Sequence, residues 1–150
     1  VDGRPCFHIS LIVDVSPNCD CHCENDAPIL PNIGMFASFD PLALDQACVD
    51  ACLAASPLPN SQLADHMANP GFHDHHDHFL NSSPESEWKS CLDHAEKIGL
   101  GNRQYELIPA TFNTATETET KPEHRLLTNC EIFILSRSGF GLQKPDEKRF

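Results

Sequence analysis

Residues 40–55 constrain the fold most, because they combine a helix start signal with an apolar stripe at helical spacing. Asp40 precedes Pro41, and a carboxylate at the N-cap with proline at the first helical position is a strong helix start. Apolar residues then recur at i, i+3, i+4, i+7, i+8 and i+11, on one side of a helix: Leu44, Ala47, Cys48, Ala51, Cys52 and Ala55. Ser56-Pro57 ends the pattern, so the segment predicts an amphipathic helix that packs against a core.

A strand precedes this helix in the prediction. Apolar and polar residues alternate along 7–15, which is the period of a β-strand, with one face formed by Phe7, Ile9, Leu11, Val13 and Val15. The short apolar stretch 33–38 predicts a second strand, and residues 62–67 predict a short helix.

A second long helix is expected after Ser83-Pro84, by the same start signal as the first. Its apolar stripe consists of Trp88, Cys91, Leu92 and Ala95, and Gly99 supplies a left-handed cap. Residues 103–108 and 130–135 predict two further strands.

These elements predict an α/β fold, with a mixed sheet and at least two packed helices, in residues 1–109. Residues 110–150 are expected to be a low-complexity linker and extension, because 111–120 are rich in Thr and Glu. Charge supports this division. Residues 1–120 carry 18 acidic and 4 basic side chains, whereas 121–150 carry 4 acidic and 6 basic ones.

The acidic balance also excludes classes of partner. A net charge of −12 argues against nucleic-acid binding, which needs a basic surface to displace counterions. No segment approaches the ~18 continuous apolar residues of a membrane helix, and no secretory leader is evident, so we expect a cytoplasmic protein with mostly reduced thiols.

The sharpest candidate for chemistry is the sequence Cys19-Asp20-Cys21-His22-Cys23. Alternate residues of an extended loop point the same way, and thiolates select zinc, copper(I) or iron–sulfur iron. Structural zinc and ferredoxin motifs instead place two residues between cysteines, so the alternative is a polar loop whose cysteines are incidental.

Other candidates are weaker. Residues 73–78, with four histidines and two aspartates, favour a solvated loop that binds divalent metals weakly over a dedicated site. Cys48, Cys52 and Cys91 lie on helix stripes, where core packing is the better interpretation. Asp45 lies off the stripe; it is expected in solvent, with a loop ligand site as the alternative.

Several spaced motifs resemble one family. Residues 14–21 and 25–29, the segment 31–38 running into Asp40-Pro41, and residues 88–107 resemble the C-terminal part of an iron–sulfur-associated family of unknown function, domain-of-unknown-function family 362. The resemblance covers residues 5–108. Cys23 and the histidine run depart from the family pattern.

The resemblance implies an α/β domain of a cytoplasmic protein, present here as the C-terminal fragment of a larger domain. In longer members this domain commonly accompanies a 4Fe–4S ferredoxin module, so the implied partner is such a module in the same or a partner chain. The module's C-x2-C-x2-C-x3-C-P motif is absent from this sequence.

Three functions are compatible with these features. The first is a ferredoxin-like, electron-transfer or metal-binding protein in which Cys19, Cys21 and Cys23 bind an iron–sulfur cluster or zinc. Asp20, His22 and Asp45 would then be second-shell or alternative ligands. The second is a substrate-binding domain of an enzyme, with the cysteine loop, Ser38 and Asp45 around a pocket. The third is a metal-free domain that docks the ferredoxin module.

Overall fold

The computed structural model describes residues 5–19 and 21–110, and the backbone of 131–136. Within these residues the helices and strands follow one another as β1 (His8–Ile12), β2 (Gly34–Ser38), α1 (Pro41–Ala54), α2 (Gln62–Ala68), α3 (His78–Ser82), α4 (Trp88–Lys97), β3 (Glu106–Ala110) and β4 (Glu131–Ser136). The predicted α/β class is confirmed.

The four strands form one mixed sheet in the order β1-β2-β4-β3. β1 pairs with β2 and β3 pairs with β4 in antiparallel fashion, whereas β2 and β4 are parallel. β4 therefore lies between β2 and β3, although its residues belong to the predicted extension. The low-complexity segment 111–120 lies outside the described residues.

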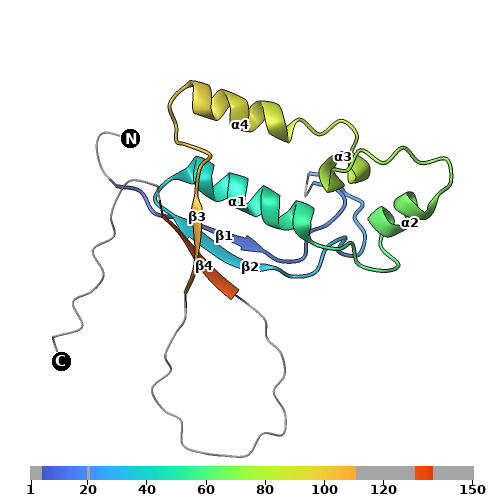
Figure 1. The fold of residues 1–150 in the computed structure, drawn as a ribbon. Helices are drawn as coiled ribbons and strands as arrows, with labels where there is room; N and C mark the ends of the chain where they lie inside the picture. The colour runs from blue at the N-terminus through green and yellow to red at the C-terminus, as the bar shows by residue number, and fades with distance from the viewer. Residues whose placement is uncertain (1–4, 20, 111–130, 137–150) are drawn as a thin grey trace, which may run out of the picture.

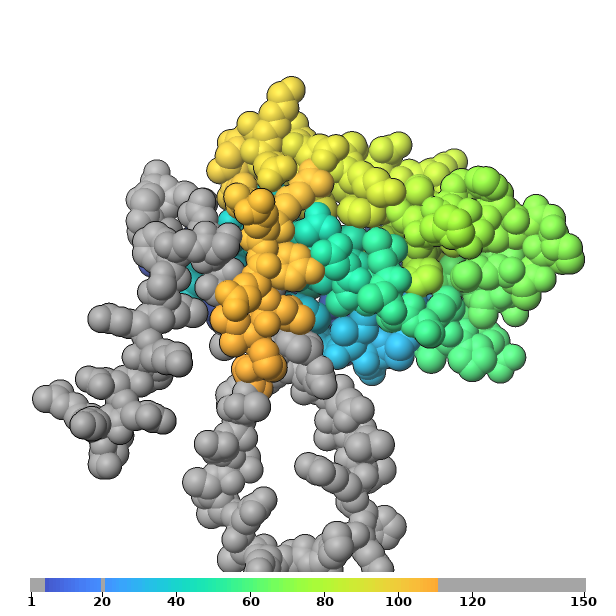
Figure 2. Space-filling view, in the orientation of Figure 1, coloured from blue at the N-terminus to red at the C-terminus, as the bar shows by residue number. Residues whose placement is uncertain are grey.

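The helices lie on one side of the sheet (Figure 1). α1 contacts β1 and β2, and α4 contacts α1. Figure 2 shows this side, where side chains of α1, α4 and β3 form one continuous surface. Beneath it lies a core formed by Ile12, Ile29, Leu30, Phe36, Leu44, Ala47, Cys52 and Leu63.

α1 begins where the sequence predicts. One Asp40 carboxylate oxygen accepts the backbone N–H groups of Leu42 and Ala43, at 3.0 and 3.2 Å. The other accepts the N–H of Asn102 at 2.9 Å and thereby ties the chain that leaves α4 to the start of α1. Gly101 makes this approach feasible, because a Cβ there would collide with the Asp40 carboxylate.

Replacing Asp40 with alanine should lower the free energy of unfolding by about 2 kcal/mol, because a helix cap and a long-range hydrogen bond are lost together. Urea denaturation measures this. The exposed Asp65 offers a control, and its alanine variant should change stability by less than ~0.5 kcal/mol. Equal effects of the two substitutions would contradict the role assigned to Asp40.

The apolar face of β1 is exposed to solvent instead of packing in the core. Phe7, Ile9, Leu11 and Val13 are exposed, and Ile12 is buried. The register explains this: Ile9 and Leu11 stand opposite Ala37 and Met35, whereas Ser10 stands opposite the buried Phe36. α1 packs on the Phe36 side, so the apolar stripe lies on the side without helices. We call Phe7, Ile9, Leu11, Val13 and Phe39 the outer face.

Several element boundaries also differ from prediction. β1 ends at Ile12 rather than 15, because Asp14 adopts a left-handed φ of 48° and donates its N–H to Asn32 Oδ1. α4 begins at Trp88 rather than Ser83. Ser83 instead ends α3, a short helix for which no prediction was made. The left-handed cap at Gly99 is confirmed, with φ 74°.

Candidate functional site: the cysteine loop

The three clustered cysteines lie in the loop that joins β1 to β2. The loop leaves the sheet where β1 ends and passes close to α3, where the Ser82 hydroxyl donates to Pro17 O at 3.3 Å (Figure 1). The hydrogen bond from Ile29 N–H to Val15 O, 2.8 Å, closes the base of the loop. Ile29 and Leu30 then enter the core. A packed base thus carries an exposed tip.

The tip forms a tight turn. The N–H of His22 donates to Cys19 O at 2.9 Å, and this turn brings the side chains of Cys19 and Cys21 together. A hydrogen bond between the two thiols, a small degree of burial and charge repulsion from Cys19 raise the pKa of Cys21 above its ordinary value. Both side chains are exposed to solvent. Cys19 and Cys21 are thus neighbours through a turn, and not through the extended loop from which the spacing predicts three sulfurs on one side.

Cys23 is engaged elsewhere. Its thiol donates to Glu24 Oε2 at 2.8 Å, and His22 Nδ1 lies 3.6 Å from Glu24 Oε1. The thiol of Cys23, the backbone and His22 together lower the pKa of Glu24. Glu24 was not predicted as a site residue. Its position directly after Cys23 was the available signal, since an ionised carboxylate next to a thiol can accept a hydrogen bond from it.

Asp20 and Asp45 were the two further candidate ligands in the prediction. Asp20 lies outside the described residues. Asp45 lies near His8, which lowers its pKa, while partial burial acts more strongly and raises it. Because β1 and β2 are antiparallel, His8 lies at the opposite end of the sheet from the loop. The structure therefore separates Asp45 from the thiols.

Ser38 shares that remote end. It stands opposite His8 in the sheet, is buried, and its hydroxyl accepts the N–H of Asp40 at 3.0 Å. Its oxygen thus supports the start of α1. In the part of the chain that the structure describes, Ser38 and Asp45 therefore lie at the end of the sheet away from the cysteine loop.

The described donors do not form a site with four protein ligands. Across residues 5–19 and 21–110, no group of three or more His, Cys, Asp or Glu side chains is arranged to hold an ion. A site with four protein ligands, as structural zinc or a 4Fe–4S cluster needs, does not fit these residues as they stand. Two neighbouring thiols do fit one soft ion.

The three cysteines of α1 and α4 divide between core and surface. Cys52 is buried and Cys48 half-buried, as expected from their helix stripe. Burial raises the pKa of Cys48 to about 11, so this thiol stays protonated and unreactive at neutral pH. Cys91 is exposed, so its predicted core position is wrong. Leu92, the next residue along α4, is the buried one.

The histidine-rich segment is held by a polar network. Asn81 is buried, accepts the N–H of His75 at 2.9 Å and donates to Asp74 Oδ1 at 2.8 Å. His76 Nδ1 pairs with Asp74 Oδ2 at 3.1 Å. His78 Nε2 lies 2.9 Å from Ala55 O, which joins α3 to the end of α1. His76 and His78 thus have structural partners, in agreement with the preferred interpretation of a polar loop.

A comparison with family models gave one match. The family is described as Domain of unknown function (DUF362), and the match spans residues 4–50. The match supports the DUF362 family. The DUF362 segment contains β1, the whole cysteine loop, β2 and the first ten residues of α1. Neither the curated proteins nor the solved structures gave a match. Among the described helices, none has the length and hydropathy needed to cross a membrane.

Proposed function

We propose that this chain is a metal-binding or redox domain that acts beside an iron–sulfur module, and that Cys19 and Cys21 together bind one soft metal ion. The contact between their two thiols carries the proposal. Two converging thiolates provide the donors that copper(I), zinc and iron prefer. The loop's exposed tip would also let a partner supply further ligands.

The neighbouring residues define how such an ion could be held. Cys21 has to lose its proton to bind, and its raised pKa means that binding releases a proton and strengthens as pH rises. A third donor could come from Cys23 once its hydrogen bond to Glu24 is broken, or from the Glu24 carboxylate itself. An ion bound here would supply Lewis acidity or, for iron and copper, one-electron chemistry.

The proposed partner is a 4Fe–4S ferredoxin module in the same or another chain. The DUF362 match, which includes the cysteine loop, supports the family on which this proposal rests. The module itself is what the sequence resemblance implies. The sequence itself lacks the ferredoxin motif, so any cluster of that type would be held by other residues.

Anaerobic titration with Cd²⁺ tests the proposal, because cadmium thiolates absorb in the ultraviolet. We expect one equivalent to bind. Because thiols lose their protons on binding, the affinity should rise from about pH 6 to about pH 8. The double variant Cys19→Ser/Cys21→Ser should lose at least tenfold in affinity, on the order of the loss seen when metal-site contacts are removed.

Cys91→Ser is the matched control, because Cys91 is also exposed but lies on α4. Its titration should equal that of the unmodified chain. Unchanged binding by the double variant, or no thiolate absorption in the unmodified chain, would refute a metal role for the loop.

A further inference from the structure

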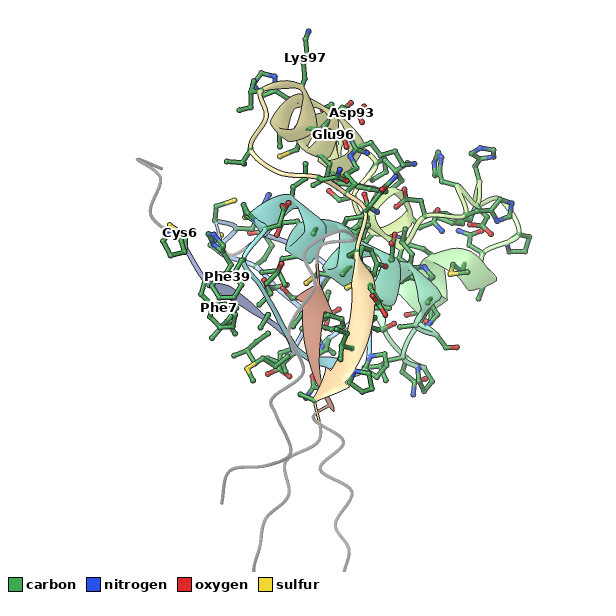
Figure 3. The ribbon with its side chains drawn as sticks, turned by 60° about the vertical axis from the view of Figure 1, so that its left-hand side comes forward. Cys6, Phe7, Phe39, Asp93, Glu96 and Lys97 are labelled. Carbon is green, nitrogen blue, oxygen red and sulfur yellow. The ribbon has the colours of Figure 1, made fainter. Side chains whose placement is uncertain are left out.

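The outer face is an apolar surface on the side of the sheet opposite the helices. Its five members are all exposed: Phe7 by 52%, Ile9 by 58%, Leu11 by 62%, Val13 by 40% and Phe39 by 67%. Phe7 and Phe39 are in contact, with ring centroids 5.0 Å apart. Figure 3 shows these two rings beside β1, on the side away from α1. The exposed residues thus form one surface.

A surface of this kind is unusual on a monomer. Contiguous large apolar side chains on a folded protein mark interaction sites. The sheet that carries this surface is mixed, with one parallel pair between β2 and β4 and antiparallel pairs at both edges. α1 covers one face of the sheet and α4 packs on α1, and no described helix lies on the outer face.

We propose that a second copy of this chain covers the outer face, and that the two sheets pack face to face across a two-fold axis. Such an interface is isologous, so every apolar residue of one copy meets the same surface on the other. β1 is an edge strand, and α1 lies behind it, so no described helix obstructs the approach of a second sheet.

The available area agrees with a weak dimer. Half-exposed large side chains offer roughly 100 Å² each, so the five members bury about 500 Å² per copy and about 1,000 Å² in total. That total meets the lower limit for a specific interface. We therefore expect reversible association in the micromolar range, about the strength typical of small interfaces.

The salt dependence of binding distinguishes a second copy of this acidic chain from a basic partner. None of the five members is charged, so two acidic chains can meet here without opposing like charges directly. The net charge of −12 on each chain still disfavours association at a distance. Salt screens that repulsion, so a dimer formed through the outer face should strengthen as ionic strength rises. A basic partner would show the opposite dependence.

Sedimentation velocity of the full chain over a range of protein and salt concentrations tests the proposal. We expect a monomer–dimer equilibrium that moves toward dimer at higher salt. Leu11→Lys should weaken dimerisation at least about tenfold, because it would bury a charge at the centre of the interface. Leu11 is more than half exposed in the monomer, so the fold should persist, and circular dichroism verifies this.

The matched control is Leu100→Lys, since Leu100 is 54% exposed but lies beyond α4. It should leave dimerisation unchanged. A chain that stays monomeric at every soluble concentration would overturn the proposal and assign the outer face to residues 137–150 or to another protein. A dimer that Leu11→Lys does not weaken would overturn it as well.

Discussion

Replacing Phe36 with alanine should lower the free energy of unfolding by about 3–5 kcal/mol, the usual cost of deleting a buried aromatic side chain. Phe36 is 2% exposed and belongs to the core cluster that includes Ile12 and Leu44. Its ring stands between the sheet and α1, so the cavity left behind would lie where the two layers meet. Urea denaturation monitored by circular dichroism measures the effect.

Phe39 provides the control for this prediction. It lies three residues further along the chain but is 67% exposed, so Phe39→Ala should change stability by less than about 0.5 kcal/mol in a dilute sample. The comparison also tests the orientation of the sheet. If Phe39→Ala cost as much as Phe36→Ala, both faces of β2 would have to be covered within one chain.

Replacing Asp77 with alanine should cost about 2–3 kcal/mol, because one buried carboxylate satisfies several donors. Asp77 Oδ1 caps α3 by accepting the N–H groups of Phe79 and Leu80, at 3.0 and 3.2 Å. Asp77 Oδ2 accepts Trp88 Nε1–H and pairs with Lys89 Nζ, both at 3.1 Å. The substitution would therefore detach α4 from α3. Thermal denaturation tests this.

The same carboxylate predicts a dependence on pH. Burial alone would raise the pKa of Asp77, but hydrogen bonds from Lys89, Leu80 and Trp88 outweigh it and hold the pKa below its ordinary value. A depressed pKa in the folded state stabilises the protein above the unfolded value of about 3.9. That stabilisation is lost as pH falls through the folded value. Asp77→Asn should weaken this acid dependence; an unaltered acid profile would contradict the assignment.

Local signals predicted the elements whose start is marked by a cap. Asp40-Pro41 and the stripe after it identify α1, and the short helix predicted at 62–67 corresponds to α2, whose start Ser61 caps. Ser83-Pro84 misled, because Ser83 is used to end α3 and leaves no cap for α4. A Ser-Pro pair can start a helix, but here the preceding helix α3 uses Ser83 as its C-cap.

Strand alternation has a related limit. The pattern along β1 correctly distinguishes two faces, but it carries no information about which face the helices cover. The face of His8 and Ser10 meets α1 because these polar groups find partners there, with His8 near Asp45 and Ser10 hydrogen-bonded to Cys48. Contacts between β1 and α1, which belong to tertiary structure, therefore decide which face of β1 the helix covers.

At the candidate site, the spacing predicts three thiols on one side of an extended loop, whereas the structure has Cys19 beside Cys21 and Cys23 bonded to Glu24. The turn from Cys19 O to His22 N–H directs Cys23 toward Glu24, and a turn of this kind depends on backbone angles that residue type alone does not fix. Asp45 is remote for another reason. The antiparallel pairing of β1 with β2 places the second turn of α1 at the far end of the sheet.

X-ray absorption spectroscopy of the chain loaded anaerobically with one equivalent of Zn²⁺ tests the central claim most directly, because it counts the sulfur atoms bound to the ion. We predict two sulfur neighbours at about 2.3 Å, from Cys19 and Cys21, and their loss in the Cys19→Ser/Cys21→Ser variant. Nitrogen and oxygen neighbours alone in the unmodified chain would contradict a thiolate site in the cysteine loop.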